Sequence, residues 1–145
     1  MQQSESIANL AKALAIVQGK LTYAKKDSKN PFFKSNYADL ESVWDACRDL
    51  LASNGLSVSQ FPGSYCEIDK SMSLTTILLH ESGEYISQEM TLPVAKPDPH
   101  GCTAAVTYMR RVSLAAVTGV VQADDDGNTA SNVVNKSVTK PVEMD

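Results

Sequence analysis

The sequence predicts an α+β fold in which helices pack against an antiparallel three-stranded β-meander. Apolar residues recur at helical spacing in three stretches, whereas apolar and polar residues alternate in the region between residues 56 and 94. The chain has 145 residues, of which 43% are hydrophobic, which is enough for one domain with an ordinary core. We expect a core domain over residues 1–128 and a disordered tail over residues 129–145, where no period is visible.

The first helix is predicted at about residues 7–21. Its apolar face consists of residues spaced three or four apart: Ile7, Leu10, Ala11, Leu14 and Val17. Ser4 or Ser6 is the expected N-cap, because a serine hydroxyl can accept a hydrogen bond from a free backbone N–H. Residues 23–37 have no helical period and are interrupted by Pro31, so we expect an ordered loop there.

The second helix is predicted from residue 38 or 39 to residue 53. Its buried stripe is formed by Leu40, Val43, Trp44, Cys47, Leu50 and Leu51. Trp44 is expected in the core. Asn54 and Gly55 follow, and both tolerate the left-handed conformation that ends many helices.

Three strands are predicted next. Leu56, Val58 and Gln60 alternate with Ser57, Ser59 and Phe61, and residues 72–79 and 85–94 are rich in residues that favour strands. Residues 81–84, with the sequence Glu-Ser-Gly-Glu, are typical of a hairpin turn. The three strands would form an antiparallel meander that ends at the prolines that follow position 92.

The third helix is predicted from residue 101 or 102 to residue 118, just before Gly119. One side carries Cys102, Ala105, Val106, Met109, Val112 and Ala116. The other side is mostly polar and carries Thr103, Thr107, Arg110, Arg111, Leu114 and Thr118. The first of these sides should face the sheet, because a helix buries its apolar stripe.

Two segments place positive charge beside aromatic rings. The candidate DNA-binding residues are Lys25, Lys26, Lys29, Phe32, Phe33, Lys34, Tyr37, Tyr108, Arg110 and Arg111. Cations neutralise phosphates and rings stack on bases, which is what a protein needs to hold a single strand. The net charge of −4 excludes a histone-like protein and confines this chemistry to a local groove.

The three cysteines, Cys47, Cys66 and Cys102, are an odd number without metal-ligand spacing, which favours reduced thiols in a cytosolic protein. The chain opens without a signal-peptide pattern, and no apolar run is long enough to cross a membrane. We therefore expect neither secretion nor a membrane anchor.

Five short motifs in order resemble the ERF (essential recombination function) family of phage single-strand annealing proteins. They are residues 6–14 (SIANLAKAL), 30–40 (NPFFKSNYADL), 54–58 (NGLSV), 108–111 (YMRR) and 124–128 (DDDGN). Each motif alone is weak, and the five together cover residues 6–128. The chain departs from the family at Val112, where an aromatic residue usually follows the paired arginines, and in its short tail.

The resemblance implies single-stranded DNA binding and annealing of complementary strands without ATP, in the cytoplasm of a bacterial host. It also implies a homo-oligomer, either a ring or a helical filament, and a core similar to that of the eukaryotic strand-annealing ring proteins. A host single-strand-binding protein is a further candidate partner. No cofactor is required under this interpretation.

Two alternatives remain open from the residues. Asp124, Asp125 and Asp126 could belong to a metal-dependent nuclease that uses Mg²⁺, although three successive aspartates on an extended chain cannot all converge on one ion. A solvated acidic exit from the third helix is the simpler interpretation of this run. The basic loop could instead meet an acidic host protein. The sequence contains no nucleophile elbow and no phosphate-cradling glycine loop, so we predict that the protein is not an enzyme.

Overall fold

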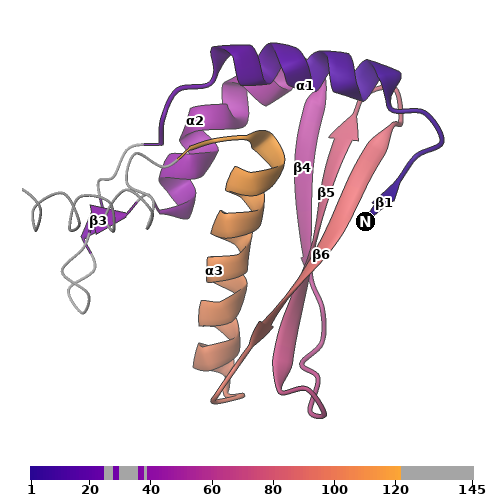
Figure 1. Ribbon diagram of the computed structural model, residues 1–145. Helices are drawn as coiled ribbons and strands as arrows, with labels where there is room; N and C mark the ends of the chain where they lie inside the picture. Colours follow the sequence, from indigo (N-terminus) through magenta and orange to yellow (C-terminus); the bar gives the residue numbers. More distant parts are fainter. Residues whose placement is uncertain (25–27, 30–35, 38, 122–145) are drawn as a thin grey trace, which may run out of the picture.

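A computed structural model of the protein describes residues 1–24, 28–29, 36–37 and 39–121. Three helices lie against one face of an antiparallel four-stranded sheet, and no helix of the described chain covers the other face (Figure 1). The elements follow in the order β1 (Gln2–Gln3), α1 (Ala8–Lys20), β2 (Ser28–Lys29), β3 (Asn36–Tyr37), α2 (Leu40–Ser53), β4 (Leu56–Pro62), β5 (Ser71–His80), β6 (Tyr85–Pro93) and α3 (Pro99–Thr118). The α+β class is confirmed.

The sheet has the strand order β1-β6-β5-β4, so the predicted meander is present but the predicted number of three strands is wrong. The fourth strand, β1, pairs with β6, with Gln2 opposite Ser87. Its end is fixed by Ser4, whose N–H donates to the carbonyl of Tyr85 at 3.0 Å and whose Oγ accepts from the N–H of Tyr85 at 3.0 Å. A strand of two residues is too short to show an alternation of apolar and polar residues, so no sequence pattern indicated it.

The start of α1 differs from the prediction, because neither serine occupies the N-cap position. Ile7 does, and its side chain makes no capping hydrogen bond. The carboxylate of Glu84, from the β5–β6 turn, accepts hydrogen bonds from the backbone N–H groups of Asn9 at 3.0 Å and Leu10 at 3.4 Å. A distant residue therefore satisfies donors that a helix leaves free at its start.

The other two helices begin at aspartates. Asp39 accepts a hydrogen bond from the N–H of Ser42 at 2.8 Å at the start of α2, and Asp98 accepts one from the N–H of Gly101 at 2.7 Å at the start of α3. Because Asp98 caps α3 and Pro99 suits a first helical position, α3 starts two residues before the earliest predicted position. The predicted end of α3 is confirmed.

The core consists of two clusters. The larger one forms where all three helices meet the sheet and includes Leu10, Val17, Val43, Cys47, Leu51, Leu78 and Leu114. The smaller one, beside the first half of α3, consists of Met72, Leu74, Val94, Ala105 and Met109. Thr76 separates the clusters on β5, between Leu74 and Leu78 on the helix-covered face, and accepts a hydrogen bond from Gln60 Nε2 at 3.1 Å.

The second half of α3 is buried on the side that we predicted to be polar. Leu114 and Thr118 are 2% and 0% exposed. The reason is that α1 crosses one end of the sheet and α2 lies beside α3, so this half of α3 is enclosed by helices as well as strands (Figure 1).

The cysteines are all free, and Cys47 lies in the larger cluster. Its burial raises the pKa of the thiol to about 11, and hydrogen bonds that involve Thr118 and its own backbone lower it only in part. The thiol of Cys47 is therefore neutral at physiological pH.

Part of the predicted binding loop falls outside the described residues, namely Lys25, Lys26, Phe32, Phe33 and Lys34. The aspartates at 124–126 and the predicted tail, residues 129–145, also lie outside them. Within the loop, β2 pairs with β3, with Ser28 opposite Tyr37 and Lys29 opposite Asn36. The predicted loop thus contains a short antiparallel pair that its sequence period did not reveal.

Candidate nucleic-acid interface

The three candidate residues of α3 lie on two flanks of the helix. Tyr108 is 48% exposed, Arg110 is exposed, and Arg111 is half-buried. Successive residues of a helix are turned by about 100°, so the side chains of Arg110 and Arg111 diverge. The guanidinium carbon of Arg111 lies 5.3 Å from the centroid of the Tyr108 ring, a cation–π contact that joins these two on one flank.

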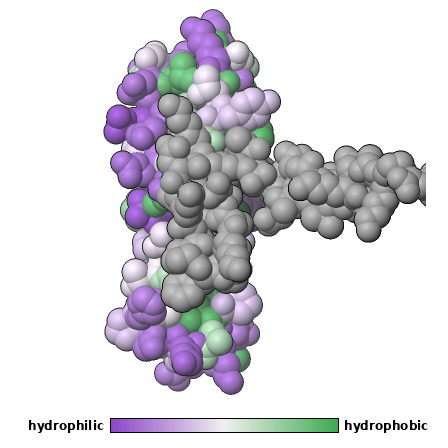
Figure 2. All heavy atoms as spheres, turned by 90° about the vertical axis from the view of Figure 1, so that its left-hand side faces the viewer, coloured by the Kyte–Doolittle hydropathy of each residue, from purple (hydrophilic) through white to green (hydrophobic). Residues whose placement is uncertain are grey.

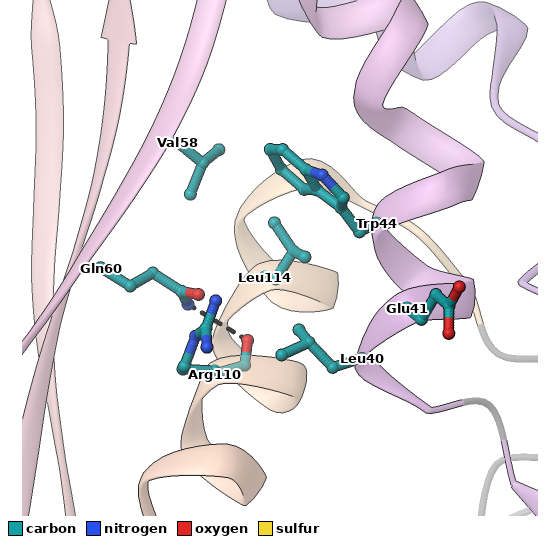
Figure 3. A pocket seen from close by; sticks show the side chains of 7 residues that line it. All are labelled: Leu40, Glu41, Trp44, Val58, Gln60, Arg110 and Leu114. Atoms are coloured by element: carbon teal, nitrogen blue, oxygen red, sulfur yellow. Dashed lines mark hydrogen bonds between the residues drawn. The ribbon is translucent and has the colours of Figure 1, made fainter.

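Arg110 faces a cleft of about 520 Å³ between α2, β4 and α3, which we call the α2–β4–α3 cleft. Figure 3 shows its side chains, except that of Glu41, pointing into a common space from the three elements. They are Leu40, Glu41, Trp44, Val58, Gln60, Arg110 and Leu114. Among these residues, only Arg110 was predicted to bind DNA.

Gln60 fixes one wall of this cleft. Its Nε2 donates to the backbone carbonyl of Arg110 at 3.1 Å (Figure 3) and also to Thr76 Oγ1 at 3.1 Å. The first bond ties the middle of α3 to β4, and the second ties β4 to β5. The position of Arg110 relative to the sheet is therefore set by hydrogen bonds as well as by packing.

Trp44 belongs to the core on one side only. It packs against the larger cluster as a half-buried residue, and it also lines the cleft. We predicted Trp44 in the core and without a role in binding. The one sequence signal for a binding role was the position of Trp44 at the edge of the apolar stripe of α2. A ring as large as an indole extends from this position beyond the residues that cover it.

The charges of the cleft are one cation and one anion. Figure 3 shows Glu41 on the opposite side of the cleft from Gln60, beyond the backbone of α2. Among the residues that the structure describes, no carboxylate forms an ion pair with Arg110. A guanidinium without a carboxylate partner is available to a phosphate.

The other flank of α3 carries a shallower depression of about 430 Å³ beside the end of β6. Tyr108, Lys96 and Ala104 are among the residues that line it. Lys96 therefore contributes a cation to the same depression as Tyr108. Lys96 was not among the predicted binding residues, because it follows the sheet in a proline-rich connection that has no sequence pattern of its own.

The predicted binding loop, residues 23–37, is followed closely in the sequence by a residue that lines the α2–β4–α3 cleft. Tyr37, in β3, precedes Leu40 of the cleft by three residues, so their Cα atoms lie at most about 11 Å apart. Lys29 lies on the strand paired with β3, opposite Asn36. The backbone of Tyr37 therefore lies close to Leu40 on the α2 wall of the cleft, and the backbone of Lys29 lies on the strand beside Tyr37.

The surface on this side of the molecule is mixed. Figure 2 shows mainly hydrophilic side chains among the described residues, with smaller hydrophobic patches between them. In the part of the chain that the structure describes, no group of three or more His, Cys, Asp or Glu residues could hold a metal ion. None of the described helices is long and apolar enough to cross a membrane.

A comparison with protein-family models gives one finding for this chain. The model of the ERF superfamily matches residues 10–144, which include α1 from Leu10 onward, the whole of α2 and α3 and the whole of the β-meander. Comparisons with curated proteins and with solved structures give no match.

Proposed function

The chain belongs to the ERF superfamily, and from this premise we propose that it binds single-stranded DNA and anneals complementary strands without ATP during phage homologous recombination. The family is associated with phage single-strand annealing proteins. The observation that carries the proposal is the position of Arg110, exposed at the rim of the α2–β4–α3 cleft, which is also lined by Leu40, three residues after Tyr37.

The proposed mechanism is electrostatic. Arginines and lysines hold the phosphates of one strand in an extended form, and rings beside them stack on some of its bases. Neutralising the backbone reduces the repulsion between two strands, and base pairing then supplies the free energy for annealing. No hydrolysis of a nucleotide and no metal cofactor is needed for these steps.

We further propose that the protein acts as a homo-oligomer in the host cytoplasm, as a ring or a helical filament with a core related to that of the eukaryotic ring proteins. Several short sites in series bind a long strand far more tightly than one site does. The outer edge of β4 pairs with no other described strand, and an unpaired edge invites pairing with a neighbouring subunit. A host single-strand-binding protein is a candidate partner.

The test combines binding and annealing. We expect Arg110→Ala with Arg111→Ala to weaken binding to a 30-nucleotide oligothymidylate and to reduce the slope of log affinity against log salt by about 1.4, because each phosphate contact contributes about 0.7 on a single strand. Fluorescence anisotropy at several salt concentrations measures both, and thermal unfolding shows whether the variant folds.

The matched control is Arg48→Ala, which removes an exposed arginine of α2 that pairs with Asp49 at 3.8 Å. This variant should bind like the wild type. An unchanged salt slope in the double variant would contradict the proposed contacts. Annealing of two complementary oligonucleotides in EDTA without ATP should proceed with wild-type protein, whereas cleavage of the strands on addition of Mg²⁺ would favour a nuclease.

A further inference from the structure

The α2–β4–α3 cleft contains more than a phosphate contact requires. Its volume of about 520 Å³ lies in the range of about 300–1,000 Å³ that is usual for small-molecule sites. An indole, an amide and a guanidinium converge on it from three different elements (Figure 3). Apolar walls with a few convergent polar groups are the features of a site for a flat, partly polar ring.

Trp44 supplies the stacking surface. One part of the side chain packs against the larger core cluster, which fixes the indole, and the remainder lines the cleft. Val58 and Leu114 form apolar walls beside it. A held indole loses little conformational entropy when a second ring stacks on it, so this contact suits any of the four bases.

Gln60 supplies one hydrogen-bond acceptor. Both N–H groups of its amide are used, by Thr76 and by the carbonyl of Arg110, whereas no described residue donates to its Oε1. Every base carries at least one N–H donor on its pairing edge, so this acceptor would favour a base over an apolar ring and would discriminate only weakly among bases.

Arg110 supplies the charge. Its side chain is exposed at the rim, and its backbone is held by Gln60. The carboxylate of Glu41 lies on the opposite side of the cleft, so the Arg110 side is where an anion would be bound. A nucleotide has this same division, with a flat uncharged base on one side and a charged phosphate on the other.

We propose that the α2–β4–α3 cleft holds one base of the bound strand, stacked on Trp44, while Arg110 contacts a neighbouring phosphate. The proposal rests on the proposed function and deepens it, because it makes recognition depend on bases as well as on phosphates. A base held in the cleft cannot pair, so it must leave the cleft when the complementary strand arrives.

The experiment uses the full chain and the natural fluorescence of Trp44, which is its only tryptophan. The probes are a 30-nucleotide oligothymidylate and an abasic deoxyribose-phosphate oligomer of the same length, both carrying a label for anisotropy. We expect both to bind at low salt, and only the oligothymidylate to quench Trp44 emission, since quenching requires a base against the indole.

The variant arm compares Trp44→Leu with Tyr85→Leu, an aromatic-to-leucine change on the face of the sheet that no described helix covers. Stacking is worth about 1–3 kcal/mol per base, so Trp44→Leu should weaken oligothymidylate binding by about 5- to 150-fold. Its affinity for the abasic oligomer and its salt slope should stay unchanged. Trp44→Phe should retain most of the oligothymidylate affinity, because phenylalanine also stacks.

The possible outcomes separate the two proposals. Binding of both oligomers with equal quenching, or with none, would refute the base site and leave single-strand binding intact. Equal affinity of Trp44→Leu and the wild type for oligothymidylate would refute it as well. Lack of binding by either oligomer at low salt would overturn single-strand binding, and the base site with it.

Discussion

The carboxylate of Glu84 joins the β5–β6 turn to the first turn of α1. It accepts hydrogen bonds from the N–H groups of Asn9 and Leu10, from Asn9 Nδ2 at 2.6 Å and from Ser82 Oγ at 2.8 Å. Burial alone would raise the pKa of Glu84, but the bonds from Ser82 and Asn9 and from the two backbone N–H groups outweigh it and hold the pKa below its ordinary value of 4.5. The ionised carboxylate is thus favoured by the folded state.

We predict that Glu84→Gln lowers the Tm by a few degrees at pH 7. The amide would place donors where only acceptors fit, opposite Asn9 and Ser82. Because folding lowers the pKa of Glu84, its contribution is present above the unfolded-state pKa and is lost as the pH falls through the folded-state pKa. The Tm difference between variant and wild type, followed by circular dichroism, should therefore shrink below about pH 4.

The control for this change is Glu67→Gln, an exposed glutamate in the β4–β5 connection for which the structure shows no such network. It should match the wild type throughout the pH range. A Tm difference for Glu84→Gln that stayed constant down to pH 3 would contradict the role assigned to its charge.

At the scale of the elements, α3 carries most of the candidate site, and its last residue is followed by a glycine with a special conformation. Gly119 has φ 87°, in the left-handed region, and its N–H donates to the carbonyl of Ala115 at 3.0 Å. A side chain at this position would also meet Gln18 of α1, whose Nε2 would lie 3.0 Å from the added Cβ. The turn after α3 therefore requires glycine for two reasons.

We predict that Gly119→Ala lowers the free energy of unfolding by about 1–2 kcal/mol, the cost of a left-handed residue with a Cβ. Gly19→Ala is the matched control, since Gly19 lies in α1 with open space around its Cβ position. That change should raise stability by up to about 1 kcal/mol. Urea denaturation measures both, and equal effects of the two changes would argue against a special role for Gly119.

The elements that the sequence revealed are those with a period of their own. The apolar stripes of α1, α2 and α3 and the alternation in β4 to β6 are local, so each could be predicted within a few residues. The pairing of β1 with β6 and the capping of α1 by Glu84 join residues more than 70 positions apart, and no local pattern encodes them.

The candidate site could likewise be predicted only in part. Arg110 was visible as a charge on a helix, whereas the cleft that it shares with Trp44 and Gln60 exists only once three elements have packed together.

At the scale of the whole molecule, the main fact is the contrast between the net charge of −4 and a proposed ligand that is itself an anion. A negative body repels DNA over its general surface, so binding must come from a small set of cations close to the strand. The slope of log affinity against log salt concentration then reports the number of those cations, because only contacts with phosphates release counterions.

The lysines of the predicted loop provide the strictest test of this idea. Changing Lys25, Lys26, Lys29 and Lys34 together to alanine moves the net charge from −4 to −8, since four of 13 positive residues are lost. The control removes the same charge elsewhere, by changing Lys12, Lys20, Arg48 and Lys70, which are all exposed. We predict that the loop variant loses up to about 3 units of salt slope, at about 0.7 per phosphate contact, and does so equally for poly-dT and poly-dA.

The control variant should lose affinity only modestly and keep its slope, because a change in net charge at a distance alters long-range attraction without removing a contact. Filter binding across salt concentrations, with both homopolymers, gives the slopes directly. If the two variants behave alike, DNA responds to the total charge of the protein, and no local channel exists. If the loss of affinity differs strongly between poly-dT and poly-dA, the loop recognises DNA mainly through contacts with bases, and its contacts with phosphates are secondary.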